Sequence, residues 1–269
     1  MIASPRVVAE VDALAAEINE FCAAHADPAV VAKYAHYFTE GYDPYGVASD
    51  VLTAQRRLWL AAHRATLGQP GFLDLADRLW AGGKYEPGFL AIYFVGAFKR
   101  EFSPETFERV GAWFAHGVWN WAHCDSLCGD LLSAFLMQEI ILLPGFAPWR
   151  ESRYKYQRRA VPVAMLTLLK TADDVTPLLD FVRPLMTDPE RVVHQGVGWF
   201  LREVWRRRPA PAEAFLLEWK DRSPRLIYQY ATEKMVPADR ARFRAETPRP
   251  PRRASRPPDP APAPAPDGA

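Results

Sequence analysis

The sequence predicts an all-α protein, built as an α-solenoid of HEAT-like helical repeats. Apolar residues recur at a spacing close to 3.6 from residue 6 to residue 246, and no β-branched alternating run is bounded by Asn-Gly or Asp-Gly turns. Prolines repeatedly follow capping residues, as they do at helix starts. About ten to twelve helices in such a body favour pairs stacked in sequence. Identical residues show no clean period, and an irregular globular bundle is the alternative.

Individual helices are marked by apolar stripes and by their first residues. The stripes comprise Val7, Val11, Leu14 and Ile18; Val30, Tyr34, Tyr37 and Phe38; and Leu73, Leu75, Leu79 and Trp80. A side-chain oxygen before a proline is typical of a helix start, because the oxygen accepts from an orphan N–H and proline has none to lose. Such pairs are Asp27-Pro28, Asp43-Pro44, Ser103-Pro104, Thr176-Pro177, Asp188-Pro189 and Ser223-Pro224.

The domain boundary is predicted from the prolines. The chain has 25, where average usage would give roughly 13, and nine of them lie in residues 247–269. That segment has no aromatic residue and no aliphatic one larger than Ala, so it cannot bury enough apolar surface to offset its ordering entropy. We therefore expect one helical-repeat domain over residues 1–246 and a disordered Pro/Ala/Arg-rich tail over residues 247–269.

Charge and cysteine content exclude several classes of protein. The 33 basic and 32 acidic residues give a net charge of +1, which argues against binding of anions by bulk charge but allows a local basic face. Three cysteines are too few for a disulfide framework. Residues 1–10 lack the features of a signal peptide, and no run of 18 apolar residues is present. We expect a monomer in the bacterial cytosol, with no membrane contact.

Residues 119–128 form the first segment that could carry chemistry. On a helix, Trp121 and Asp125 are one turn apart and share a face. An indole and a carboxylate placed in this way suit a positively charged ligand, because the carboxylate supplies charge and the ring its electron-rich face. The alternative makes Asp125 the N-cap of a helix over residues 126–141, and Trp121 a core residue.

The same segment contains residue types that bind metals, namely His123, Cys124 and Cys128, with His116 nearby. His123 and Cys128 lie on different helix faces, and no C-x-x-C or H-E-x-x-H spacing is present. His123 and Cys124 point about 100° apart on a helix, which disfavours a Cys–His nucleophile. We therefore expect no metal site and no cofactor.

The helix predicted to start at residues 188–189 has two faces. Its core stripe, within about 40° on the helix, comprises Val193, Val197, Phe200 and Val204. Trp199 lies roughly 120° from the centre of that stripe, beside Gly196, which we expect to open a groove. Trp199 either packs a second interface or faces a ligand. We expect Arg202 and Glu203 to form ion pairs between helices.

Two further segments suit phosphate. Residues 150–159 hold five basic residues, one acidic residue and two tyrosines. Cations interleaved with aromatic rings suit a nucleic-acid backbone, and a solvated face is the alternative. The candidates for DNA contact here are Arg153, Lys155, Arg158 and Arg159. In the turn over residues 41–50, Tyr45 and Gly46 could present backbone N–H groups to a phosphate, with an ordinary turn as the alternative.

These segments together resemble one family, the AlkD-type DNA alkylation repair glycosylases. Residues 121–125 are similar to its Trp-x-x-x-Asp motif, and residues 193–203 are similar to its late Gly-Trp-x-Leu-Arg-Glu helix. The resemblance extends over residues 34–235 and includes the turn at residues 45–47, the helix start at 158–160 and the closing helix at 230–234.

The resemblance implies a solenoid whose concave face binds duplex DNA and an enzyme that removes N3- and N7-alkylated purines. By analogy, Asp125 is the catalytic carboxylate, Trp121 and Trp199 line the deoxyribose, and Arg159 contacts the DNA backbone. The second hypothesis is a non-catalytic DNA- or protein-binding solenoid. The presence of Asp125 with both tryptophans favours the enzyme. The near-neutral charge, together with Asn120 and Ala122 beside Trp121, favours the alternative.

Overall fold

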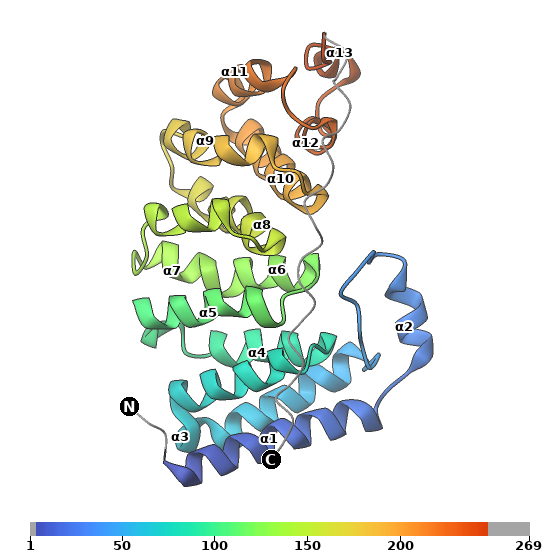
Figure 1. The fold of residues 1–269 in the computed structure, drawn as a ribbon, viewed down its shortest axis with the longest axis vertical. Coiled ribbons are helices and arrows are strands. Elements are labelled where there is room, and N and C mark those ends of the chain that lie inside the picture. The colour runs from blue at the N-terminus through green and yellow to red at the C-terminus, as the bar shows by residue number, and fades with distance from the viewer. Residues whose placement is uncertain (1–3, 247–269) are drawn as a thin grey trace. The chain divides into compact units, whose positions relative to one another are not determined.

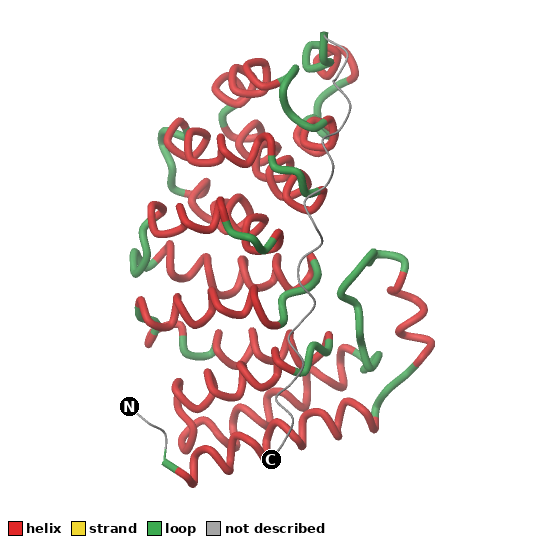
Figure 2. Tube along the Cα trace, in the orientation of Figure 1, coloured by secondary structure: helices red, strands yellow, loops and turns green. Residues whose placement is uncertain are grey.

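The computed structural model describes residues 4–246, which form thirteen α-helices with 3₁₀ and π segments and no strand (Figures 1 and 2). The all-α class is confirmed, and helices pack mainly on helices one or two places away in the sequence, as in a helical-repeat protein. Contacts divide the chain into two compact units, and the division falls between Ile141 and Leu142. The predicted tail at 247–269 lies outside the described residues. No helix of the described part is long and apolar enough to cross a membrane.

The first unit contains seven α-helices, and most of them pack on a helix one or two places away in the sequence (Figure 1). Helix α1 packs on α3, α3 packs on α4, and α4 packs on α6 and on the π segment η2 that continues it. The elements are α1 (Pro5–Ala24), α2 (Pro28–Ala35), α3 (Ser49–Ala81), α4 (Tyr85–Gly96), η1 (Lys99–Glu101), α5 (Pro104–His116), α6 (Trp121–Leu127), η2 (Cys128–Leu132) and α7 (Ser133–Met137).

Two predicted helix starts in this unit are confirmed and one is wrong. Asp27 caps α2, and Ser103 caps α5 in a capping box with Thr106. Residues 41–48, in contrast, form a loop. There the carboxylate of Asp43 pairs with Lys84 at 2.8 Å, and its carbonyl accepts from the N–H of Tyr85 at 3.1 Å. Asp43 therefore anchors the loop to the start of α4 and caps no helix.

Helix α3 is two helices joined at a kink. Gly68 adopts φ 55° and ψ −169°, a conformation open essentially to glycine alone, and Pro70 follows two residues later. Since Pro70 removes one helical hydrogen bond, the kink has a local sequence cause. The second half of α3 carries the predicted stripe at Leu73, Leu75 and Leu79, which is buried.

The second unit is centred on α10, which packs against α8, α11 and α12. Its elements are η3 (Leu143–Glu151), α8 (Lys155–Ala164), η4 (Met165–Lys170), α9 (Thr176–Val182), η5 (Arg183–Thr187), α10 (Arg191–Arg207), α11 (Pro209–Trp219), α12 (Arg225–Ala231) and α13 (Pro237–Ala241). Helix α10 begins at Arg191, slightly later than predicted, because the carboxylate of Asp188 accepts from the N–H of Glu190 at 2.8 Å and holds a turn there.

The stripe predicted for α10 and the residues Val11, Leu14 and Ile18 of the one predicted for α1 form core, whereas the stripe predicted for α2 does not. Val193, Val197, Phe200 and Val204 are each 0% exposed. Complete burial of side chains of this size contributes about 1.5–3 kcal/mol each. Helix α2 has no buried residue, and the side chain of Tyr37 is 60% exposed. The stripe at Val30, Tyr34, Tyr37 and Phe38 is therefore a surface feature, and α2 itself ends at Ala35, before its last two members.

Candidate functional site

In the first unit, the candidate site is built around the start of α6, and Asn120 fixes that start. The side-chain oxygen of Asn120 accepts from the N–H of His123 at 2.8 Å, which is an N-cap bond. Its amide nitrogen donates to the carbonyl of Gly41 at 2.8 Å and to Nδ1 of His123 at 3.0 Å. The interpretation of Asp125 as the N-cap is therefore wrong, because Asp125 lies one turn inside the helix. The sequence signal for Asn120 was a capping residue directly before Trp121.

Trp121 and Asp125 lie on one face of α6, as their spacing predicts. Trp121 is 39% exposed, its indole N–H donates to the carbonyl of Tyr37 at 3.1 Å, and its ring stacks on Phe38 with centroids 5.4 Å apart. Phe38 stacks in turn on Tyr42 at 4.3 Å. The stacking on Phe38 and the hydrogen bond of the indole N–H thus fix the ring, while the exposed part of Trp121 stays open to a ligand. Asp125, one turn later, is half-buried.

His123 holds α6 against α4 and is not placed as a ligand or base. Its Nε2–H donates to the carbonyl of Tyr85 at 2.8 Å, while Nδ1 accepts from Asn120. Burial lowers the pKa of His123 to about 4, so the ring is neutral at pH 7. Gly88 makes room for the ring, since a Cβ there would lie 2.7 Å from it. Within the described residues, no cluster of three or more His, Cys, Asp or Glu side chains is placed to hold a metal ion.

The turn at residues 45–47 is held by a carboxylate that the sequence reasoning missed. Buried Glu86 accepts from the N–H groups of Tyr45 at 2.9 Å, Gly46 at 2.7 Å and Val47 at 3.2 Å. Gly46 has φ +88°, and a Cβ there would lie 2.3 Å from the carbonyl oxygen of Asp27. The N–H groups that could have bound a phosphate are already bonded to Glu86. These contacts favour the alternative that the segment is an ordinary, tightly anchored turn.

In the second unit, Trp199 projects from α10 away from the buried stripe and is only partly covered. The two glycines beside it serve packing. A Cβ on Gly196 would lie 3.2 Å from Cγ of Arg159, and a Cβ on Gly198 would lie 2.6 Å from Cβ of Tyr230. The groove expected at Gly196 is therefore filled by Arg159, and α10 is closely packed between α8 and α12.

Two of the predicted DNA-binding arginines are buried. Arg158 is 3% exposed; its Nε lies 2.6 Å from a carboxylate oxygen of Asp188, and a second N–H donates to the carbonyl of Ser152 at 2.6 Å. Arg159 is 5% exposed and donates to the carbonyl of Val192 at 2.7 Å. These contacts tie α8 to the start of α10. Since a buried, bonded guanidinium is not available to a surface phosphate, we correct both assignments to structural roles.

The other two predicted contacts differ in exposure. Arg153 is exposed, with its guanidinium 4.9 Å from the ring centroid of Tyr154. Lys155 is half-buried, with Nζ 5.7 Å from the ring centroid of Tyr156. Stacked on neighbouring rings, both cations keep a defined place near the surface. They remain compatible with a contact to a nucleic-acid backbone.

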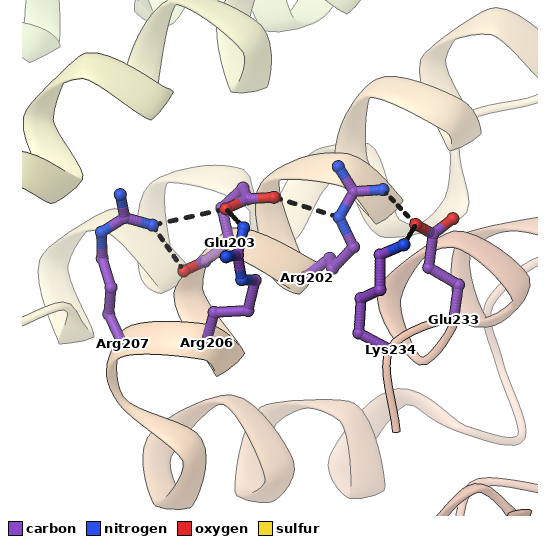
Figure 3. A network of polar contacts seen from close by, with 6 residues as sticks. All are labelled: Arg202, Glu203, Arg206, Arg207, Glu233 and Lys234. Atoms are coloured by element: carbon purple, nitrogen blue, oxygen red, sulfur yellow. Dashed lines mark hydrogen bonds and ion pairs between the residues drawn. The ribbon is translucent and has the colours of Figure 1, made fainter. Parts of the chain in front are cut away.

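The ion pairs predicted for Arg202 and Glu203 connect α10 to the segment after α12 (Figure 3). Arg202 bonds Glu203 at 3.1 Å and Glu233 at 2.7 Å, and Glu203 also accepts from Arg206 at 3.1 Å. Glu203 therefore binds cations of the last turn of α10, namely Arg206 and Arg207. This network stabilises the unit and carries no chemistry of its own.

The fold and the site define a class of protein, an all-α helical-repeat protein that presents a Trp–Asp pair on one short helix. The chain belongs to the DNA alkylation repair enzyme family, whose model matches residues 18–235. A solved structure described as a predicted DNA alkylation repair enzyme from Enterococcus faecalis is similar in fold, with a TM-score of 0.65 and 17% sequence identity over 79% of this chain and 98% of that chain. No curated protein matches the chain. Family membership supports a role in DNA repair, with DNA as substrate.

Proposed function

We propose that the protein is a DNA glycosylase that excises cationic N3- and N7-alkylated purines from duplex DNA. The observation that carries this proposal is the pair on α6. Trp121 and Asp125 share one face, Trp121 is 39% exposed, and its ring is held by Tyr37 and Phe38. A fixed indole beside a carboxylate is suited to a positive charge, and both the substrate and its transition state carry one.

The chemistry needs few groups. An N3- or N7-alkylpurine is already cationic, so the base can leave without protonation by a general acid. Its departure leaves oxocarbenium character on the deoxyribose. The carboxylate of Asp125 stabilises that charge and orients the attacking water, and the indole of Trp121 adds stabilisation through its π face. One carboxylate is then sufficient where sugar hydrolases usually need two.

The remaining site residues enter as parts of the same proposal. Trp199 serves as the second indole at the sugar, and Lys155 and Arg153 contact DNA phosphates. Tyr45 and Gly46 contribute through the shape of their turn, since their N–H groups are bonded to Glu86. The enzyme would act as a monomer on chromosomal DNA in the cytosol.

The test is release of 7-methylguanine and 3-methyladenine from methylated duplex DNA, corrected for spontaneous depurination. Asp125→Asn is expected to lower the rate about 10²–10³-fold, the usual effect of removing one electrostatic group from such a site. Glu108→Gln, which neutralises an exposed carboxylate on α5, is the matched control and keeps the wild-type rate.

Two outcomes would contradict the proposal. If the wild-type protein binds duplex DNA and releases no alkylated base, the non-catalytic binding protein on the same scaffold becomes the better description. If uncharged bases such as hypoxanthine are released as fast as 7-methylguanine, the leaving group is being protonated and Asp125 does not act by charge stabilisation alone.

A further inference from the structure

A surface cleft of about 520 Å³ lies in the first unit, outside the Trp121–Asp125 pair. Its walls come from the first half of α3, from α4, from η1 and from η2. Three cations and one carboxylate line it, namely Arg56, Arg64, Lys99 and Asp130. A cleft with such an excess of positive charge is suited to an anion.

The two arginines are held in place by rings. The guanidinium of Arg56 lies 4.2 Å from the ring centroid of Tyr93, and its Nε is buried with no hydrogen-bond partner. The guanidinium of Arg64 lies 4.5 Å from the ring centroid of Phe98 and donates one hydrogen bond, to the carbonyl of Ala97 at 3.1 Å. Stacking fixes each guanidinium plane and leaves further N–H groups for a ligand.

The positive charge of the cleft is not neutralised by the protein. Within residues 4–246, Arg56, Arg64 and Lys99 form no ion pair, with Asp130 or with any other carboxylate. Other arginines of this unit do: Arg109, for example, pairs with Asp74 and Asp77, each at 2.5 Å. A buried guanidinium nitrogen without a partner has a desolvation cost that a bound anion would offset.

The cleft is connected to the helix of the candidate site. Phe89 lines the cleft, and its ring packs edge-on against His123 of α6 with centroids 4.9 Å apart. Asp130 lies in η2, the direct continuation of α6. The cleft therefore lies against α4 and the continuation of α6, the same elements that hold the candidate site in place.

We propose that this cleft binds a backbone phosphate of the duplex DNA substrate, with Arg56, Arg64 and Lys99 as its cationic contacts. The choice of DNA rests on the proposed function. The planar, stacked guanidinium groups suit the oxygens of a phosphodiester, and the cleft volume leaves space for the sugars on either side.

The experiment measures binding of undamaged duplex DNA by fluorescence anisotropy over a range of salt concentrations. The cleft variant is Arg64→Gln/Lys99→Gln, and the matched control is Arg57→Gln/Arg100→Gln, which removes two exposed cations next to lining residues. Loss of one phosphate contact is expected to weaken binding several-fold and to reduce the slope of log K against log salt by about 0.9. The control variant, Arg57→Gln/Arg100→Gln, is expected to keep most of the wild-type slope.

A third variant separates an electrostatic role from a structural one. Asp130→Asn removes the carboxylate from the cleft and is expected to tighten DNA binding, with thermal unfolding unchanged because Asp130 is exposed. Arg56→Gln, checked by circular dichroism, should behave like the cleft variant.

The outcomes are distinguishable from failure of the proposed function, because undamaged DNA requires no base release. If the two double variants lose affinity equally, bulk charge explains binding and the cleft proposal is overturned. It is also overturned if the cleft variant binds DNA normally but loses thermal stabilisation by inorganic phosphate, since the cleft would then be a small-anion site. If the cleft variant has a smaller salt slope than the control but the wild-type protein releases no alkylated base, the cleft proposal stands and the proposed glycosylase activity is contradicted.

Discussion

The indole N–H of Trp121 donates to the backbone carbonyl of Tyr37, with 3.1 Å between the two atoms, and so joins the first turn of α6 to the end of α2. The stacking of Trp121 on Phe38 comes from the same segment. Because α2 itself has no buried residue, this exposed segment is tied to the site mainly by aromatic contacts and backbone hydrogen bonds.

Trp121→Phe is expected to lower the rate of base release about five-fold, because a phenyl ring keeps the stacking and loses a hydrogen bond worth about 1 kcal/mol. Trp121→Ala should lower it further, to about 30-fold, since the π face is lost as well. Trp205→Phe is the control: it loses a similar bond, from Nε1 to Glu213 at 3.1 Å, elsewhere in the chain. Equal rates for all three variants would exclude a role for the Trp121 indole in catalysis.

The buried His123 predicts a pH-dependent stability. Its pKa is about 4 in the folded state against an ordinary value of 6.5, so the unfolded chain binds the extra proton between these values. The free energy of unfolding should therefore fall by about 3 kcal/mol from this group as the pH drops from 6.5 towards 4.

This contribution is measured as the difference between wild-type protein and His123→Gln in urea unfolding at pH 7.5, 6, 5 and 4. The advantage of the wild type should shrink as the pH falls. His116→Gln, on an exposed side chain, should follow the wild-type curve. A constant difference between wild type and His123→Gln would show that the imidazole is not held neutral.

The buried pair of Arg158 and Asp188 predicts a large effect on stability. Arg158→Ala should lower the free energy of unfolding by about 3–5 kcal/mol, because it leaves the Asp188 carboxylate buried and without its cation. Arg153→Ala, on an exposed side chain, should change it by less than about 0.5 kcal/mol. If Arg158→Ala left stability unchanged and weakened DNA binding, the original assignment of Arg158 to the DNA backbone would be restored.

Two glycines on α10 should respond differently to the same substitution. Gly198→Ala places a Cβ 2.7 Å from the backbone oxygen of Ile227, so α10 and α12 must move apart, at a cost of about 1–3 kcal/mol. Gly196→Ala meets Cγ of Arg159 at 3.2 Å, a milder approach that a shift of a few tenths of an ångström relieves. The gain in helix propensity of about 1 kcal/mol should then make that variant roughly neutral. Thermal unfolding checks both, and equal loss in the two variants would contradict this account of the packing.

Much of the fold was predictable because its signals are local. The 3.6-residue spacing of Val193, Val197 and Phe200 predicts an α10 core stripe that is fully buried. The Ser103-Pro104 pair predicts the start of α5, where the capping bonds lie within four residues. The similar spacing at Val30 and Tyr34 marks an exposed helix, since periodicity shows which residues share a face but not whether another helix covers it.

The sequence by itself determined the all-α class and the placement of Trp121 and Asp125 on one helix face, because both follow from the pitch of a helix. Only the tertiary structure decided that Glu86 occupies the N–H groups of the 45–47 turn and that Arg158 is buried. Both depend on contacts between segments that are distant in the sequence; for example, 40 residues separate Gly46 from Glu86. A charged residue type alone does not reveal whether its partner is another side chain, the backbone or a ligand; that is settled by the packing that surrounds it.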